Sequence, residues 1–152
     1  MNGASPTEAV VSLHGLERRY QMGDSEVAAL AGVDLTIARG EFVAIVGPSG
    51  SGKSTLMYLL GCLDSPTAGS LRLLGSEAAG LADSALSRLR NRAIGFVFQQ
   101  FFLLPQLDLV ENVALVLAYA GVPGRDRRRI ARSLLDQVGL GDRLHHRPNQ
   151  LS

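Results

Sequence analysis

The sequence predicts an α/β fold in which a core of strands and helices is followed by a purely helical segment. Three observations predict this class. Short apolar runs typical of strands recur through the first hundred residues, a glycine-rich loop joins one of them to a helical pattern, and only helical periodicity remains beyond residue 101. A chain of 152 residues is also a suitable length for one compact domain.

The elements of the core follow from the spacing of apolar residues. Residues 1–8 are small and polar, so we expect them to form a disordered terminus. Alternating or unbroken apolar positions predict strands at 9–20, 27–37, 42–46, 70–74 and 94–98, and helical patterns predict helices from Lys53 to about Leu60 and at 83–91. The runs at 42–46 and 94–98 contain no alternating polar residues, which indicates strands that are buried on both faces.

Two further helices are expected in the remainder of the chain, at 109–120 and 126–138. In the second one, three apolar residues recur at i, i+4 and i+8 and predict the buried face: Ile130, Leu134 and Val138. The predicted organisation is therefore an α/β core at 9–100 and a helical subdomain at 101–152.

The composition excludes several classes of protein. Fifteen Lys and Arg residues balance 14 Asp and Glu, so the net charge of +1 gives no overall reason to expect a nucleic-acid partner. The single cysteine, Cys62, excludes an intrachain disulfide and fits a reducing compartment. The longest uncharged stretch, at 93–107, is shorter than the ~20 residues of a membrane-spanning helix. With no signal peptide recognised at the N-terminus, we expect a soluble, intracellular chain.

The segment with the clearest chemistry matches the phosphate-loop pattern G-x-x-x-x-G-K-[ST]. It consists of Gly47, Pro48, Ser49, Gly50, Ser51, Gly52, Lys53, Ser54 and Thr55. Glycines allow the backbone to wrap around a phosphate with its N–H groups pointing inward, and the following helix adds the positive end of its dipole. In this pattern Lys53 reaches the β- and γ-phosphates, and the Ser54 hydroxyl ligates Mg²⁺.

Composition and context both argue against a chance match to this pattern. A chain of this composition would contain the pattern by chance on the order of once in 10³ cases. The chain has one lysine against 14 arginines, and that lysine, Lys53, stands where the motif requires it. The motif is shared by small-molecule kinases, GTPases, helicases and transport ATPases, so it does not by itself name the activity.

Three further segments narrow the choice: LLGCLDSPTAGSLRLLG at 59–75, RLRNRAIGFVFQQFFLLPQLDLVENV at 88–113, and RPNQLS at the end. Together with the loop, this ordered set resembles the ATP-binding subunit of an ATP-binding cassette (ABC) transporter over about 10–152. It is most similar to the branch that serves lipoprotein release and macrolide-type export. The resemblance implies a P-loop NTPase core with a mixed sheet, the start of an α-helical subdomain, and binding of ATP with Mg²⁺.

The resemblance also implies roles for two residues outside the loop. Tyr20 matches the aromatic residue that stacks on adenine, and a tyrosine packed on the core is the alternative interpretation. Gln99 matches the glutamine that contacts Mg²⁺ or the attacking water, and its neighbour Gln100 is the alternative for this role. Lys53 and Gln99 are thus the expected catalytic residues, and Ser54 and Gln99 the expected metal ligands.

Two kinds of protein partner are implied by the same family. The segment Gln99–Leu104 contains four consecutive large apolar residues. In the family that the chain resembles, this region receives helices of a membrane permease, although part of the run is expected to be core. Leu151 and Ser152 match the start of the LSGGQ signature, which binds nucleotide held by a second copy of the subunit. An arginine-rich helix at 125–132 is interpreted as a solvated face rather than a nucleic-acid site.

The chain departs from the family pattern in one respect, because Ser152 precedes the segments that supply the catalytic base and the switch histidine. The C-terminal part of the domain is therefore expected to be absent, so that the chain binds ATP but hydrolyses it negligibly by itself. The leading prediction is the energy-coupling subunit of an export-type transporter, peripheral on the inner face of the cell membrane. A non-catalytic nucleotide-binding remnant or regulatory module is the alternative, and a P-loop kinase or GTPase is the third possibility.

Overall fold

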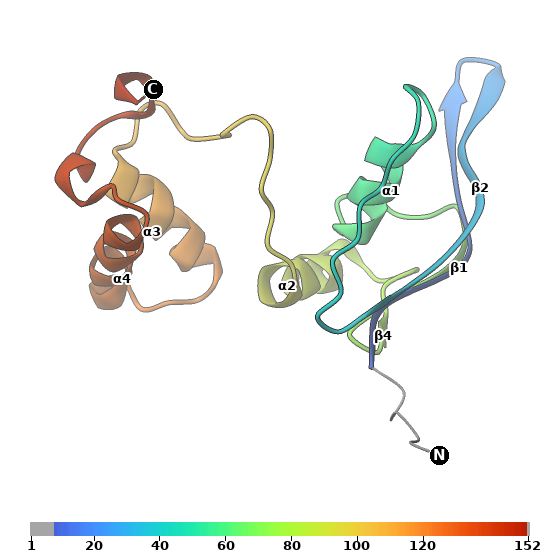
Figure 1. The fold of residues 1–152 in the computed structure, drawn as a ribbon, viewed down its shortest axis with the longest axis horizontal. Coiled ribbons are helices and arrows are strands. Elements are labelled where there is room, and N and C mark those ends of the chain that lie inside the picture. The colour runs from blue at the N-terminus through green and yellow to red at the C-terminus, as the bar shows by residue number, and fades with distance from the viewer. Residues whose placement is uncertain (1–7, 152) are drawn as a thin grey trace. The chain divides into compact units, whose positions relative to one another are not determined.

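The computed structural model describes residues 8–151, which separate into two compact units that divide between Gly95 and Phe96. Most of the predicted disordered terminus at 1–8, and Ser152 of the predicted signature, lie outside the described residues. The elements are β1 (Ala9–Met22), β2 (Ser25–Ala38), α1 (Lys53–Leu60), β3 (Ala68–Leu73), β4 (Ser76–Glu77), α2 (Asp83–Ala93), α3 (Leu109–Tyr119), α4 (Gly124–Gln137) and the 3-10 turns Gly141–Arg143 and Pro148–Gln150 (Figure 1).

The first unit is built on a sheet with the strand order β2-β1-β3-β4, in which every described strand pair is antiparallel. β1 and β2 form a long hairpin because Gly23, with φ 62°, supplies the left-handed backbone that the turn between them requires. β3 pairs with the opposite edge of β1 and places Leu71 beside Leu13. The central position of β1 thus connects the hairpin to the rest of the sheet.

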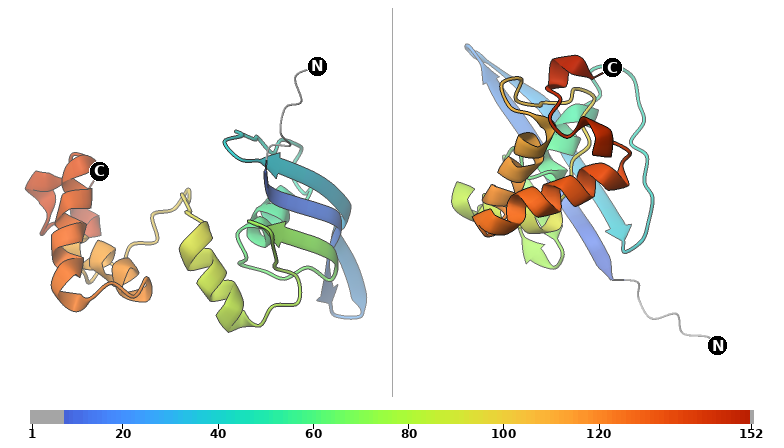
Figure 2. Two further views of the ribbon diagram at one scale, coloured as in Figure 1. Left: turned by 90° about the horizontal axis from the view of Figure 1, so that it is seen from below. Right: turned by 90° about the vertical axis from the view of Figure 1, so that its left-hand side faces the viewer.

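Both helices of this unit, α1 and α2, lie on the same face of the sheet (Figures 1 and 2). Leucines from both layers form the core: Leu13, Leu16, Leu30, Leu71 and Leu73 from the strands, Leu56 and Leu59 from α1, and Leu86 from α2. A leucine side chain contributes about 1.5–3 kcal/mol when it is fully buried. The core therefore fixes α1, and with it the phosphate loop, against the sheet.

The two apolar runs predicted as buried strands, 42–46 and 94–98, are not strands in the structure. Phe42 and Val46 are 95% and 86% exposed, and Val97 is fully exposed. A strand buried on both faces needs neighbouring strands to satisfy its backbone N–H and C=O groups, and neither run pairs with any described strand. The two strands predicted at 42–46 and 94–98 are therefore not formed in the described part of the chain.

The second unit consists of α3 and α4 packed around four buried residues: Leu109, Val110, Ala131 and Leu135. The predicted buried face of α4 is wrong, because Leu134 and Val138 are 43% and 70% exposed. Ala131 and Leu135 have the same i, i+4 spacing one position further along, and the small Ala131 side chain, 0% exposed, allows close packing on this face. Apolar spacing alone does not choose between two such series.

No helix in the described part of the chain is both long enough and apolar enough to span a membrane.

Candidate functional site

The phosphate loop leads directly into α1, and its geometry leaves the helix N-terminus open. Gly52 is the N-cap, with φ 84°, and the first hydrogen bond of the helix runs from the Leu56 N–H to the Gly52 carbonyl at 2.8 Å. No side chain caps this end, and the first turn contains no acidic residue. Because the first N–H groups of a helix lack partners within it and carry partial positive charge, this end is suited to bind an anion.

Gly52 is the glycine that fixes the loop against the sheet. A Cβ atom at this position would lie 2.5 Å from the Ala29 carbonyl oxygen and 2.8 Å from Leu30 Cδ2, both in β2. Gly50 also has a left-handed backbone, with φ 79°, but a Cβ there would meet nothing within 4 Å. Gly52 therefore allows a close approach to β2, whereas Gly50 allows only a change of backbone direction. Gly47, with φ 158°, lies near extended backbone.

Lys53 folds back across the loop that precedes it. Its Nζ donates a hydrogen bond to the Pro48 carbonyl at 2.6 Å and lies 3.4 Å from the Ser51 hydroxyl oxygen. Within residues 8–151, none of the ion pairs joins Lys53 to an acidic side chain. The positive charge at the start of α1 is therefore held by neutral acceptors, and an incoming phosphate would supply a charged one.

The other predicted loop residues can be placed as well. Ser49 and Ser54 are exposed, and Thr55 is half-buried. A serine hydroxyl is a hard oxygen ligand of the kind that Mg²⁺ prefers, and this ion is commonly held by one or two protein oxygens together with substrate phosphates. Ser54 fits that role, and the described residues contain no group of three or more His, Cys, Asp or Glu side chains that would form an all-protein metal site.

Tyr20 lies near the end of β1, in the same unit as the phosphate loop. It is paired with Val27 of β2, two residues from Ala29, which contacts the Gly52 backbone. Two residues along a strand span about 7 Å. The hairpin therefore brings Tyr20 to the same region of the unit as the loop, and its role toward a base stays a prediction.

Gln99 belongs to the second unit, whereas the phosphate loop belongs to the first. Gln99 and Gln100 are both exposed and lie in an irregular connection, because the strand expected to present Gln99 at its end is not formed. The structure therefore groups the loop residues with Tyr20 and leaves the predicted catalytic and metal-binding role of Gln99 untested.

An aromatic cluster occupies the start of the second unit. The rings of Phe96 and Phe98 are stacked with centroids 5.2 Å apart, and Phe102 meets Phe98 edge-on at 5.0 Å. Phe101 and Phe102 are 82% and 70% exposed. A cavity of about 310 Å³ lies beside these two rings, and it is lined by Phe101, Phe102, Leu103, Pro148 and Leu151. Large apolar side chains exposed together are typical of an interaction surface.

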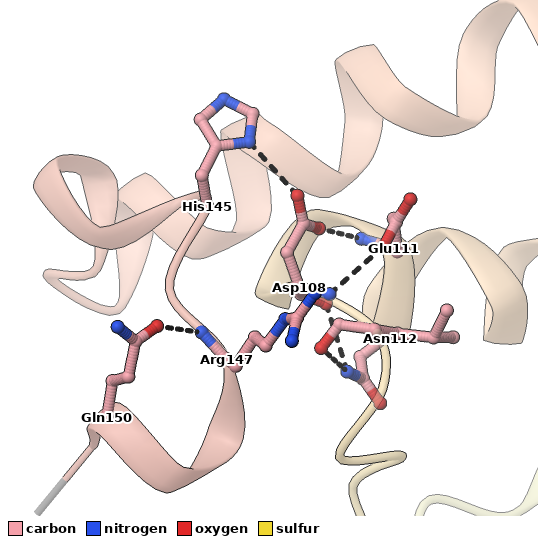
Figure 3. A network of polar contacts seen from close by, with 7 residues as sticks. Asp108, Glu111, Asn112, His145, Arg147 and Gln150 are labelled. Carbon is pink, nitrogen blue, oxygen red and sulfur yellow. Dashed lines mark hydrogen bonds and ion pairs between the residues drawn. The ribbon is translucent and has the colours of Figure 1, made fainter.

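The N-terminus of α3 is held by a polar network that sequence reasoning did not anticipate (Figure 3). Asp108 accepts a hydrogen bond from the Glu111 N–H at 2.7 Å, and Glu111 accepts one from the Asp108 N–H at 3.0 Å, which completes a capping box. His145 Nδ1 lies 3.0 Å from the second Asp108 carboxylate oxygen. Burial raises the pKa of Asp108, but the Glu111 amide, His145 and Arg128 lower this pKa by more, so it lies below its usual range.

Asn112, in the first turn of α3, fixes the chain that leads out of the aromatic cluster. Its side chain accepts a hydrogen bond from the Leu104 N–H at 2.8 Å and donates to the carbonyls of Leu104, Leu107 and Asp108. The residue is only 8% exposed. It satisfies backbone groups that would otherwise lose their partners on burial. The D-x-x-E spacing could have indicated the capping box, but the contacts of Asn112 and His145 carry no local signal of this kind.

The fold and the loop together define a class of protein, an α/β P-loop core joined to a helical segment. Residues 30–152 match the family described as ABC transporter. The chain belongs to this family, in the part that forms its ATP-binding domain, so the predicted fold class and family are both confirmed.

Individual relatives agree with this assignment. An uncharacterized ABC transporter ATP-binding protein of Thermotoga maritima is 54% identical over 94% of this chain and 61% of its own length. A macrolide export ATP-binding/permease protein MacB of Rhodopseudomonas palustris is 52% identical over 95% of this chain and 22% of its own length. The solved dimeric structure of the ATP-binding cassette MJ0796 in a post-hydrolysis state, bound to ADP and Pi, is 43% identical, with a TM-score of 0.83 over 93% of this chain and 63% of that chain. The chain thus spans about three fifths of the Thermotoga maritima protein and of MJ0796, and about a fifth of the MacB protein.

Proposed function

We propose that this chain is the nucleotide-binding part of an ATP-driven export system, and that it binds Mg-ATP at residues 47–55. The observation that carries the proposal is Lys53, the only lysine of the chain, which stands at the open N-terminus of α1 without an acidic partner in the described residues. The Lys53 ammonium group, the dipole of α1 and the unpaired N–H groups of its first turn all favour an anionic ligand at the same place. The ADP and Pi bound to the MJ0796 cassette support a nucleoside polyphosphate as that ligand.

A titration of the purified chain with Mg-ATP tests the proposal. Lys53→Ala removes the cation inside the loop, and Arg125→Ala is a matched control that removes an 87% exposed cation in the other unit. We expect saturable binding that Lys53→Ala weakens at least tenfold, which corresponds to the ~1.5–3 kcal/mol of a charge-assisted hydrogen bond, and that Arg125→Ala leaves unchanged. Equal effects of the two variants, or no saturable binding by the unaltered chain, would contradict it.

We further infer that this chain binds ATP without appreciable turnover. Hydrolysis needs a group that orients the attacking water, and a carboxylate is a common choice. Within the described residues, the side-chain hydrogen bonds of 47–55 run from Lys53 to Pro48 and Ser51, and none of them involves a carboxylate. Phosphate release by the unaltered chain at a rate typical of an intact cassette, and lost in Lys53→Ala, would refute this inference.

Export as the coupled process, and a membrane permease as partner, are supported by the relatives. The MacB proteins are named ATP-binding/permease proteins for macrolide export. The exposed Phe101 and Phe102 of the Gln99–Leu104 segment offer the apolar surface that a permease helix could contact. On this proposal the chain lies on the cytoplasmic side of the membrane, and the dimeric state of MJ0796 supports pairing with a second copy.

A further inference from the structure

Three side chains form a tight polar cluster in the same unit as the phosphate loop, two from β1 and one from the chain that follows α1. The Tyr20 hydroxyl donates a hydrogen bond to Asp64 Oδ2 at 2.7 Å. Arg18 binds the same carboxylate with two nitrogens, Nε at 2.9 Å from Oδ2 and Nη2 at 2.7 Å from Oδ1. The Arg18 guanidinium also lies over the Tyr20 ring, 4.5 Å from its centroid. Each member of the cluster therefore contacts both others.

Hydrogen bonds attach the segment that carries Asp64 to strand β1. The Asp64 carboxylate also accepts a hydrogen bond from the Ser65 N–H at 2.8 Å. Thr67, three residues further on, accepts one from the Arg19 N–H of β1 at 2.8 Å and donates its own N–H to the Glu17 carbonyl at 2.9 Å. The segment that carries Asp64 is thus attached to the same strand that carries Tyr20, so the two side chains have little freedom to separate.

Charge and burial favour the ionised form of this carboxylate. Burial raises the pKa of Asp64, but the Tyr20 hydroxyl, the Ser65 amide and Arg18 lower this pKa by more, so it lies below its usual range. The side chains of Arg18 and Asp64 are only 22% and 23% exposed. A partly buried, two-point arginine–carboxylate pair is geometrically specific, unlike a pair of mobile surface charges.

This arrangement determines which face of the Tyr20 ring can meet a ligand. Arg18 covers one face, because its guanidinium lies 4.5 Å above the ring centroid. The hydroxyl is fixed by Asp64, so the ring cannot turn freely. A planar base can therefore stack only on the face opposite Arg18. Tyr20 is half-buried, and its strand partner Val27 lies two residues from Ala29, the β2 residue that contacts the phosphate loop at Gly52.

We propose that Asp64 and Arg18 are positioning residues for the base of the bound nucleotide: together they fix the Tyr20 ring in the orientation in which the face opposite Arg18 stacks on the base. This inference rests on the proposed function, because it requires that residues 47–55 hold the phosphates of the same ligand. It assigns to two residues outside the loop a role in recognising the base and none in holding the phosphates.

Binding of ATP and of inorganic tripolyphosphate, each with Mg²⁺ and the purified chain, separates the two parts of the site. Tripolyphosphate carries the phosphates without a base, so it reports on the loop and on correct folding only. Tyr20→Ala removes the ring, Asp64→Ala and Arg18→Ala remove its supports, and Asp64→Asn keeps an oxygen acceptor for the Tyr20 hydroxyl. Asp24→Ala is the matched control, because it removes an exposed carboxylate from the adjacent hairpin turn.

We expect Tyr20→Ala to weaken ATP binding about 5- to 150-fold, the range of base–aromatic stacking. Asp64→Ala and Arg18→Ala should weaken it by a smaller factor, Asp64→Asn should recover part of the loss, and Asp24→Ala should have no effect. Tripolyphosphate affinity should stay within about twofold in all five variants.

Other results would overturn the inference. Equal losses for ATP and tripolyphosphate in Asp64→Ala would mean that the cluster only supports the fold, and unchanged ATP affinity in Asp64→Ala and Arg18→Ala would mean that Tyr20 needs no support. If the unaltered chain bound tripolyphosphate and ATP equally well, stacking on Tyr20 would be excluded while the phosphate loop would stand. If it bound neither ligand, the proposed function would fail and this inference with it.

Discussion

Replacement of Gly52 by alanine tests whether close packing against β2 holds the phosphate loop in place. The added Cβ would lie 2.5 Å from the Ala29 carbonyl oxygen and 2.8 Å from Leu30 Cδ2, and the backbone φ of 84° is left-handed. A left-handed backbone costs an L-residue ~1–2 kcal/mol, and overpacking typically costs ~1–3 kcal/mol. We therefore expect Gly52→Ala to lower the free energy of unfolding of the first unit by ~2–5 kcal/mol.

Gly50→Ala is the matched control, because it has the same kind of backbone, with φ 79°, and nothing within 4 Å of the added Cβ. It should show only the backbone cost of ~1–2 kcal/mol. Urea unfolding followed by circular dichroism measures both variants, and hydrogen exchange in β1 and β2 assigns the change to the first unit. If Gly52→Ala destabilised the chain no more than Gly50→Ala does, the packing argument would be refuted.

Three further predictions concern the second unit. Asn112→Ala should lower its free energy of unfolding by ~2–4 kcal/mol, because Leu104 and neighbouring backbone groups lose their buried partners, and hydrogen exchange at 104–112 should rise with it. Asp108 has a lowered pKa in the folded state, so its contribution to the free energy of unfolding is present above about pH 4 and is lost as the pH falls further. The difference in free energy of unfolding between the unaltered chain and Asp108→Ala should therefore shrink below about pH 4. A difference that stayed constant from about pH 7 to about pH 3 would contradict this prediction. If the proposed permease contact is right, replacing the exposed Phe101 and Phe102 by serine should abolish capture of the chain by that permease in a pull-down assay while Mg-ATP binding is retained, and unchanged capture would contradict the proposal.

The position of the phosphate loop before a helix could be predicted from the sequence because its signals are local. The phosphate-loop pattern specifies glycines, a lysine and a helix start within nine consecutive residues, and the structure begins α1 at Lys53. Helices α1 to α4 and strands β1, β2 and β3 also lie within a few residues of their predicted bounds, since each carries its own apolar periodicity, whereas the two-residue strand β4 was not predicted.

The rest depends on contacts between distant parts of the chain. The apolar runs at 42–46 and 94–98 predicted strands, yet a strand exists only where another strand supplies hydrogen bonds, and no described strand pairs with either run. The contact between Arg18 and Asp64 spans 46 residues, and the one between Asp108 and His145 spans 37. No spacing within either segment indicates its partner.

By itself the sequence determined the family, and it predicts the place where the phosphates of a nucleotide would bind. Both follow from short ordered motifs whose requirements on the backbone are local. Only the tertiary structure decided that Gly52 must be a glycine because β2 passes beside it, that Asp64 holds the Tyr20 hydroxyl, and that Ala131 rather than Leu134 is buried. The physical reason is the same in each case: steric contact, hydrogen bonding between side chains and burial depend on what the folded chain brings alongside a residue, and that neighbour is remote in the sequence.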